Sequence, residues 1–77
     1  MANVLDLAYQ AYGVEGGFII EFVTSPTTYE AWLYHESEGI KTLMFGVDKK
    51  NTDYTKFQKM VLAVQDEYIE DYKETIM

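Results

Sequence analysis

The fold of this chain is decided by residues 18–36, which read FIIEFVTSPTTYEAWLYHE. Large apolar side chains in residues 18–24 alternate between two faces, and a period of two is typical of a β-strand. One of these faces carries Phe18, Ile20 and Phe22. The sequence Ser25-Pro26-Thr27 then favours a turn, so residues 18–36 predict two strands joined by a short connection.

The second strand, over 29–36, also alternates, and a third strand over 40–47 follows the turn sequence Ser37-Glu38-Gly39. One face of the second strand carries Glu30, Trp32, Tyr34 and Glu36, and the other carries Tyr29, Ala31, Leu33 and His35. In the third strand, Leu43, Phe45 and Val47 share a face. Because the connections are short, we expect the strands to pair antiparallel in chain order, as a three-stranded meander.

Helical spacing flanks the strands on both sides. Residues 3–12 have one apolar face, with Asn3 as the cap, Gly13 as the end, and Val4, Leu7, Ala8, Ala11 and Tyr12 on the face. A last helix begins near Tyr54, and its apolar stripe consists of Tyr54, Phe57, Val61, Val64, Tyr68 and Tyr72. We therefore expect a single α+β domain over 1–77, in the order α-β-β-β-α, with the helices packed on one face of the sheet.

The composition argues against an enzyme, a metal site and a bound cofactor. The chain has no cysteine and one histidine, His35, so the usual ligands of zinc are missing. Glu36 and Glu38 flank His35, but general acid–base catalysis also needs an oriented partner and a substrate pocket. The glycines at 13, 16 and 17 lack the Lys-Ser/Thr of a phosphate-binding loop. We expect a non-enzymatic protein without a metal or cofactor.

Charge narrows the choice of partner. Thirteen Asp and Glu residues face six Lys residues, which gives a formal net charge of −7. This disfavours nucleic acid as a direct ligand, because phosphate contacts need Lys and Arg. No apolar run is long enough to span a bilayer, and the chain opens without the basic and apolar segments of a secretory leader. We expect a cytoplasmic protein that binds neither nucleic acid nor membrane directly.

The last helix concentrates negative charge opposite its apolar stripe. Five carboxylates fall within an arc of about 140°, and they belong to Asp66, Glu67, Glu70, Asp71 and Glu74. Like charges at i, i+4 repel by about 0.2–0.5 kcal/mol per pair, and the C-terminal end of a helix disfavours anions. Two interpretations remain open. The residues form either an ordinary solvated helix end or a ligand for a basic protein surface.

The density of this charge invites comparison with DNA. The five carboxylates give about one charge per 2.5–3 Å of helix axis, against one per about 1.7 Å for duplex DNA. Glu30, Glu36 and Glu38, or a second copy of the chain, would raise that density if they lie nearby. In size, acidity and lack of cysteine, the chain resembles the small inhibitors that bacteriophages make against host DNA-handling proteins, several of which imitate DNA.

That resemblance implies an inhibitor or modulator acting in the host cytoplasm. Its target would be a host protein with a basic DNA-binding surface, such as a sliding clamp, nuclease, polymerase or repair enzyme. The resemblance rests on overall size and charge, so it transfers no individual residue role.

A second candidate surface is aromatic. Trp32 and Tyr34 share a strand face, and Tyr and Trp are common anchors of protein interfaces, although they are equally normal strand residues. The first two strands carry apolar groups on both faces, whereas helices cover only one. A domain of this size also has little core to spare. The alternative to an inhibitor is therefore a small structural or assembly subunit that oligomerises through an apolar sheet face, and in either case we expect a homodimer or larger assembly.

Overall fold

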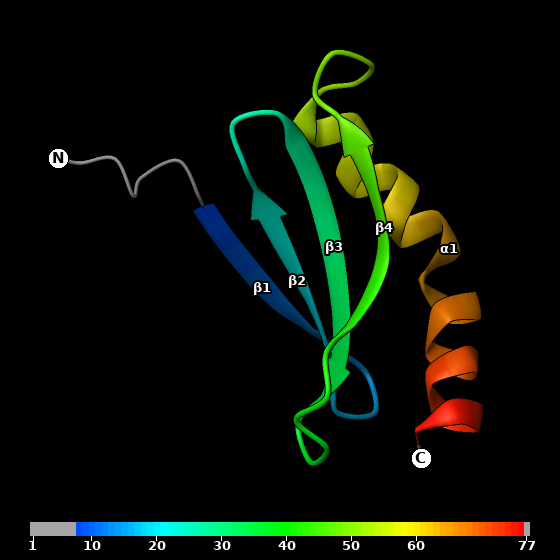
Figure 1. The fold of residues 1–77 in the computed structure, drawn as a ribbon. Helices are drawn as coiled ribbons and strands as arrows, with labels where there is room; N and C mark the ends of the chain where they lie inside the picture. Colours follow the sequence, from blue (N-terminus) through cyan, green and yellow to red (C-terminus); the bar gives the residue numbers. More distant parts are fainter. Residues whose placement is uncertain (1–7, 77) are drawn as a thin grey trace, which may run out of the picture.

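The computed structural model describes the backbone of residues 8–76 and the side chains of residue 11 and residues 13–76. Four strands form one antiparallel sheet in the order β1-β2-β3-β4, and α1 packs on one face of it (Figure 1). The elements are β1 (Ala8–Val14), β2 (Phe18–Thr24), β3 (Thr28–His35), β4 (Thr42–Asp48) and α1 (Tyr54–Thr75). The α+β class and the C-terminal helix are confirmed, but the sheet has a fourth strand where the sequence predicted three.

The additional strand replaces the second half of the helix that we expected over 3–12. Residues 8–14 form β1, whereas residues 3–7 lie outside the described part of the chain. The register pairs Val14 with Phe18 and Ala8 with Thr24, so β1 continues the sheet along the whole of β2. The sequence AYQAYGV fits a period of two as well as the helical spacing. Pairing with β2 decides between the two, because tertiary contacts override weak local preferences.

Two glycines close the β1–β2 hairpin. Gly16 and Gly17 have φ values of 95° and 89°, in the region that L side chains rarely adopt. At Gly17 a Cβ atom would also lie 2.8 Å from His35 Nε2, so a side chain there would displace the His35 ring in addition to straining the backbone. Gly13, expected to end a helix, instead lies inside β1 and has no positive φ.

A β-bulge in β4 corrects the expected face of Leu43. Ala31 pairs with Phe45, but the next residue, Trp32, pairs with Leu43, which leaves Met44 as the extra residue. Met44 is buried and Phe45 packs against the core. Directly paired residues share a face, so Leu43 lies with Trp32 on the side away from α1. Strict alternation, which placed Leu43 with Phe45 and Val47, fails here.

The core lies between α1 and the sheet, with the Phe57 side chain at its centre. Phe57 is fully buried, and its ring centroid lies 5.9 Å from Phe22, 5.7 Å from Tyr29 and 5.5 Å from Phe45. These three aromatic residues belong to β2, β3 and β4, respectively. Aromatic pairs at such distances add to the free energy gained by burying their area. One side chain of α1 therefore fixes the helix to three strands.

The helix has a defined start and presents the predicted stripe to the sheet. Asp53 caps it, because a side-chain oxygen of Asp53 accepts a hydrogen bond of 2.8 Å from the backbone N–H of Lys56. Of the predicted stripe, Phe57, Val61 and Tyr72 are buried, and Tyr54 and Tyr68 pack against the core, whereas Val64 is only partly buried and does not pack against it. Ile69 is also buried, which the stripe had not included.

The central role of Phe57 gives a stability prediction. Replacing Phe57 by Ala removes a ring that is 0 % exposed and leaves a cavity, so the free energy of unfolding should fall by about 3–5 kcal/mol. A domain of this size has a total stability of about 5–10 kcal/mol, so the variant should be unfolded or close to it. Chemical denaturation followed by far-UV circular dichroism measures the change. A loss below about 1 kcal/mol would show that the helix packs by a different face.

Tyr54 gives a prediction on alkaline pH. Burial raises the pKa of the Tyr54 phenol above its ordinary value of 10.0, and the nearby Tyr29 raises it further. The folded state therefore favours the neutral phenol. This contribution is complete below the pKa of the unfolded chain and is lost as pH rises through the folded pKa. Between about pH 9 and about pH 11.5, the parent should lose more free energy of unfolding than the Tyr54→Phe variant does. Denaturant titration at both pH values measures these losses. Equal losses of free energy of unfolding in the parent and in the variant would contradict the prediction.

Candidate functional site

Three segments bring carboxylates together at one end of the molecule. The β1–β2 turn, the β3–β4 turn and the C-terminal half of α1 all lie at this end (Figure 1). We define the acidic end by its eight exposed carboxylate residues, which are Glu15, Glu36, Glu38, Asp66, Glu67, Glu70, Asp71 and Glu74. All five acids predicted on the helix are therefore exposed, and Glu36 and Glu38 join them from the second turn.

Tyr72 ties these segments to one another. Its ring is buried against Phe18 of β2, and its hydroxyl donates a hydrogen bond of 2.7 Å to the carbonyl oxygen of Ile40. The same hydroxyl accepts a hydrogen bond of 3.3 Å from the backbone N–H of His35. The C-terminal part of α1 is thus fixed against both ends of the β3–β4 turn, so the helix and turn carboxylates keep a defined relative position.

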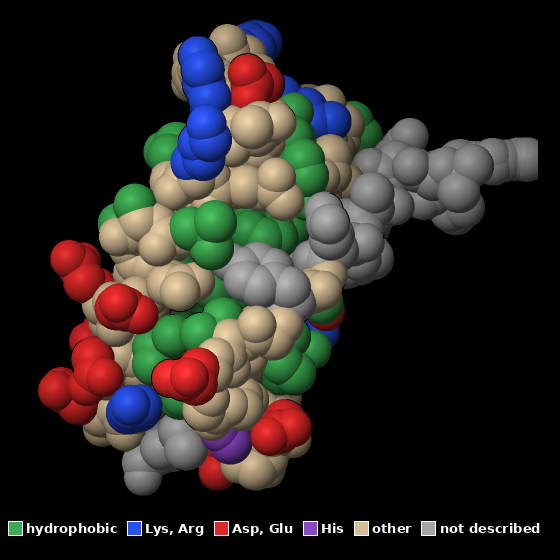
Figure 2. Space-filling view, turned by 180° about the vertical axis from the view of Figure 1, so that it is seen from behind, with side chains coloured by type: hydrophobic (Ala, Val, Ile, Leu, Met, Phe, Trp, Pro, Cys, Tyr) green, Lys and Arg blue, Asp and Glu red, His purple; other side chains and the backbone are tan. Residues whose placement is uncertain are grey.

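The acidic end holds most of the net charge of the protein. Its eight carboxylates lie with two ammonium groups, those of Lys73 and of Lys41 in the β3–β4 turn, which gives a formal charge of −6 on a chain of −7. The other four lysines lie around the β4–α1 connection and the first turns of α1. Figure 2 shows most lysines at one end and most acids at the other. We call the first of these the lysine end, and it consists of Lys49, Lys50, Lys56 and Lys59.

A groove runs into the acidic end between the β1–β2 turn and α1. It has a volume of about 550 Å³, and its lining includes Glu15, His35, Asp66, Glu70 and Lys73. Lys73 lies 3.4 Å from Glu70, but both side chains are largely exposed, and an exposed pair of this kind is worth little. The groove therefore presents more negative than positive groups to whatever enters it.

The hydrogen bonds of His35 give it a structural role. Nδ1 accepts from the backbone N–H of Ser37 at 3.1 Å, and Nε2 lies 2.9 Å from the carbonyl oxygen of Gly16. This network assigns the proton to Nε2, which donates to the carbonyl. The ring also packs edge-on against Phe18 at 4.8 Å. His35 thus connects the two turns of the acidic end, with both of its ring nitrogens engaged.

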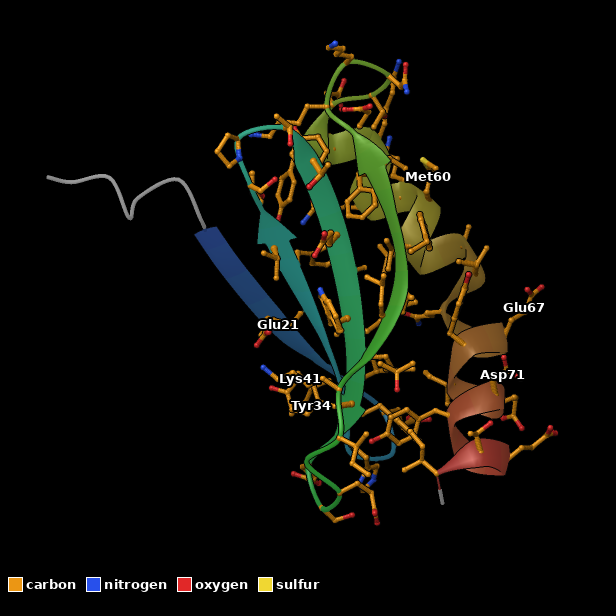
Figure 3. All side chains as sticks on the ribbon, viewed as in Figure 1. Glu21, Tyr34, Lys41, Met60, Glu67 and Asp71 are labelled. Atoms are coloured by element: carbon orange, nitrogen blue, oxygen red, sulfur yellow. The ribbon has the colours of Figure 1, made fainter. Side chains whose placement is uncertain are left out.

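The face of the sheet turned away from α1 is the second candidate surface, and we call it the open face. Its described side chains include Ile19, Glu21, Val23, Glu30, Trp32, Tyr34 and Leu43. Figure 3 shows Glu21, Tyr34 and Lys41 on this side, whereas Glu67 and Asp71 project from the outer side of α1. Trp32 and Tyr34, predicted as interface anchors, are half-buried on the open face.

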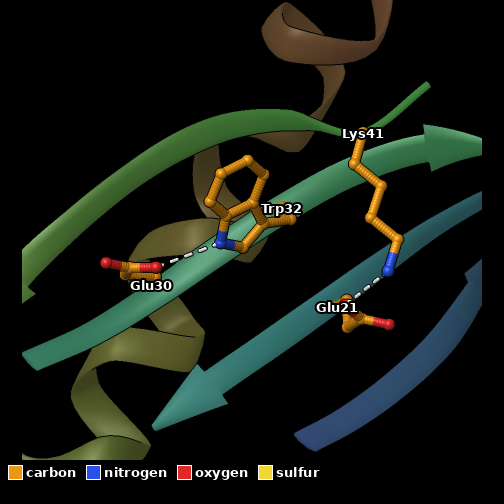
Figure 4. A network of polar contacts seen from close by, with 4 residues as sticks. All are labelled: Glu21, Glu30, Trp32 and Lys41. Atoms are coloured by element: carbon orange, nitrogen blue, oxygen red, sulfur yellow. Dashed lines mark hydrogen bonds and ion pairs between the residues drawn. The ribbon is translucent and has the colours of Figure 1, made fainter. Parts of the chain in front are cut away.

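Three charged groups of the open face are paired within the chain, as Figure 4 shows, whereas Asp48, which pairs with Thr28 at the end of β4, is exposed on this face. Lys41 Nζ lies 3.0 Å from Glu21 Oε1 and 5.1 Å from the centroid of the Tyr34 ring. Trp32 Nε1 donates a hydrogen bond of 3.1 Å to Glu30 Oε1. A shallow hollow of about 410 Å³ interrupts this face beside Gly13, Ile19 and Tyr34.

The acidic end differs from the sequence prediction at two residues, Glu30 and Glu15. Glu30, expected near the helix acids, lies instead on the open face beside Gly46, at the half of β3 nearer the lysine end. Glu15 was missed, although it lines the acidic groove with Asp66 and Glu70. Its position depends on the β1–β2 hairpin, which was not predicted because residues 3–12 were expected to form a helix.

Among residues 8–76, no three His, Asp or Glu side chains gather in a way that could hold a metal ion. Within the same part of the chain, no helix is both long and apolar enough to cross a membrane.

Comparison of the chain with protein-family models, with curated proteins and with solved structures gives no match. Function must therefore be inferred from the shape and charge of the molecule itself.

Proposed function

We propose that this protein is a non-enzymatic binding module that places its acidic end on a basic surface of another protein. The surface has the character of one that holds DNA phosphates, so the protein would inhibit or modulate a host DNA-handling protein. Sliding clamps, nucleases, polymerases and repair enzymes are the candidate targets. A single observation carries the proposal: eight exposed carboxylates, against the two ammonium groups of Lys41 and Lys73, give one end of the molecule a formal charge of −6.

The cost of this arrangement supports a functional origin. The pairs 66/70, 70/74 and 67/71 place carboxylates at i, i+4, where like charges repel. The C-terminal end of α1 disfavours anions as well, and Lys73 is the one base in its last turn. Solubility alone would be served by spreading the same acids over the surface. Concentrating them makes the electrostatic potential more negative at the place where a basic partner would approach.

The carboxylates around the groove also match a phosphate-binding surface more closely than the carboxylates of α1 would by themselves. Carboxylates from two segments line a groove instead of following a single line: Glu15 belongs to the β1–β2 turn on one wall, and Asp66 and Glu70 belong to α1 on the other. A Lys or Arg side chain that normally contacts a phosphate could place its charge between those walls. Because every carboxylate of the acidic end is exposed, a partner would meet them without prior rearrangement of the fold.

A second candidate function, a small structural or assembly subunit, is favoured by the open face. There an indole and several aliphatic side chains have no layer packed against them in the described chain. The two functions respond differently to salt, because screening weakens binding through exposed charges and leaves contact between apolar surfaces intact.

The central prediction concerns the helix acids. Asp66, Glu67, Glu70, Asp71 and Glu74 are changed together to Asn and Gln. Immobilised parent protein is used to capture its partner from host lysate, and the captured protein is then titrated with parent and variant. The variant should bind at least about tenfold more weakly, mainly through slower association. Parent binding should also fall as NaCl rises from about 0.1 M to about 0.3 M, and duplex DNA should compete.

Two controls make the outcome interpretable. The double variant Asp66→Asn/Glu70→Gln removes two negative charges from the groove. The control Glu30→Gln/Asp48→Asn removes an equal number of negative charges at positions away from the acidic end. Only the first pair should weaken binding. The five-site variant should be at least as stable as the parent, because carboxylate repulsion disappears. Unchanged affinity in the folded variant would refute the acidic end as the site, and failure of DNA to compete would refute DNA mimicry.

A further inference from the structure

We infer that the open face is a self-complementary interface, on which a second copy of this chain packs with its acidic end beside the lysine end of the first. This deepens the second candidate function, because it names the occupant and the orientation at the open face, and it concerns a different surface from the acidic end. It needs no knowledge of the partner that binds the acidic end.

The first support is the state of the charged groups on the open face. Burying a charge is costly unless it is already paired. Lys41 and Glu21 form an ion pair of 3.0 Å in which the Glu21 side chain is only 16 % exposed. Glu30 accepts the hydrogen bond of the Trp32 indole. Glu21, Glu30 and Lys41 already have partners within the chain. Burying them in an interface therefore costs less free energy than burying unpaired charges would.

The second support is that the open face carries less net charge than the acidic end. Glu21, Glu30, Glu36, Asp48 and Lys41 give it a formal −3, on a chain of −7. A second copy carries the same −7, so two copies repel each other strongly at the acidic end. Coulomb repulsion is weakest where like charges are fewest, and the open face combines that property with apolar side chains. A strongly basic partner would instead be drawn to the acidic end.

The available area sets how the copies must meet. With strands about 4.8 Å apart and residues about 3.4 Å apart, a sheet of four strands of seven or eight residues covers about 450 Å² in plan. A stable interface buries about 800 Å² of accessible surface on each partner. Protruding side chains and the hollow beside Tyr34 enlarge the accessible area beyond the plan area, so the whole face must take part.

The charge distribution then selects the orientation. Two identical sheets that pack face to face align their strands to within about 30°, and the two-fold axis lies between them. An axis parallel to the strands would place both acidic ends side by side. An axis across the strands places Glu36 and Glu38 of the β3–β4 turn beside Lys49 and Lys50 of the second copy's β4–α1 connection, whereas the charges on α1 stay on the outer sides of the pair. Only the second arrangement brings opposite charges together, and it sets the two Trp32 side chains close to the centre.

Trp32 provides a direct test, because it is the only tryptophan of the chain and lies on the open face. Sedimentation should show dimer formation between about 1 µM and about 500 µM. Over the same range, Trp32 fluorescence should shift to shorter wavelength and become less accessible to acrylamide. A protein that stays monomeric throughout would overturn the inference. So would a dimer in which acrylamide quenching stays unchanged, because the copies would then meet elsewhere.

Two leucines form a matched pair of variants. Leu43 is 45 % exposed and pairs with Trp32 on the open face, whereas Leu62 is 48 % exposed on α1. Each is changed to Lys. Leu43→Lys should raise the dissociation constant of the dimer at least about tenfold, and Leu62→Lys should leave it unchanged. Equal effects of the two variants would contradict the open face as the interface.

Orientation is tested by cross-linking, because the chain contains no cysteine of its own. Thr27→Cys marks the β2–β3 turn beside Lys49, whose backbone N–H donates to the Thr27 carbonyl oxygen at 2.9 Å. Glu38→Cys marks the acidic end. A short bismaleimide should link a mixture of the two variants into heterodimers and give little product with either alone. Efficient linking of Glu38→Cys to itself would place the acidic ends side by side and overturn the proposed orientation.

Discussion

The packing of one helix along the strands governs the rest of this structure. The Phe57 ring contacts aromatic residues of β2, β3 and β4, and Tyr72 binds the backbone at both ends of the β3–β4 turn. These two contacts lie fifteen positions apart on α1, so they fix its direction as well as its depth. Because the helix is aligned with the sheet, its acidic C-terminal half must lie at the end where two turns also present carboxylates.

The same alignment explains what the sequence could and could not foresee. The helix stripe and the faces of residues 18–24 and 29–35 follow from strong periodicity, and the structure confirms both. Residues 8–14 carry a weaker pattern that fits two periods, and only pairing with β2 resolves it. The bulge at Met44 leaves no local signal either. The five helix acids were foreseeable from spacing, whereas the addition of Glu15 and the exclusion of Glu30 depend on register.

The two surfaces of the molecule follow opposite physical rules. At the acidic end, exposed carboxylates stand close together with little compensation, which water tolerates and a basic partner would exploit. On the open face, Glu21, Lys41 and Glu30 each have a partner within the chain, and apolar side chains lie between them. The first surface acts over the range of the Debye length. The second acts only on contact, when water leaves it.

Separation of the lysine end from the acidic end also gives the molecule a large permanent electric dipole, roughly parallel to α1. The helix macrodipole points the same way, since its negative pole lies at the C-terminus. In the field of a cationic surface, such a dipole experiences a torque before any atoms touch, and the chain would arrive already turned. A larger fraction of encounters with the cationic surface then occurs in the correct orientation. This raises the association rate without any added contact.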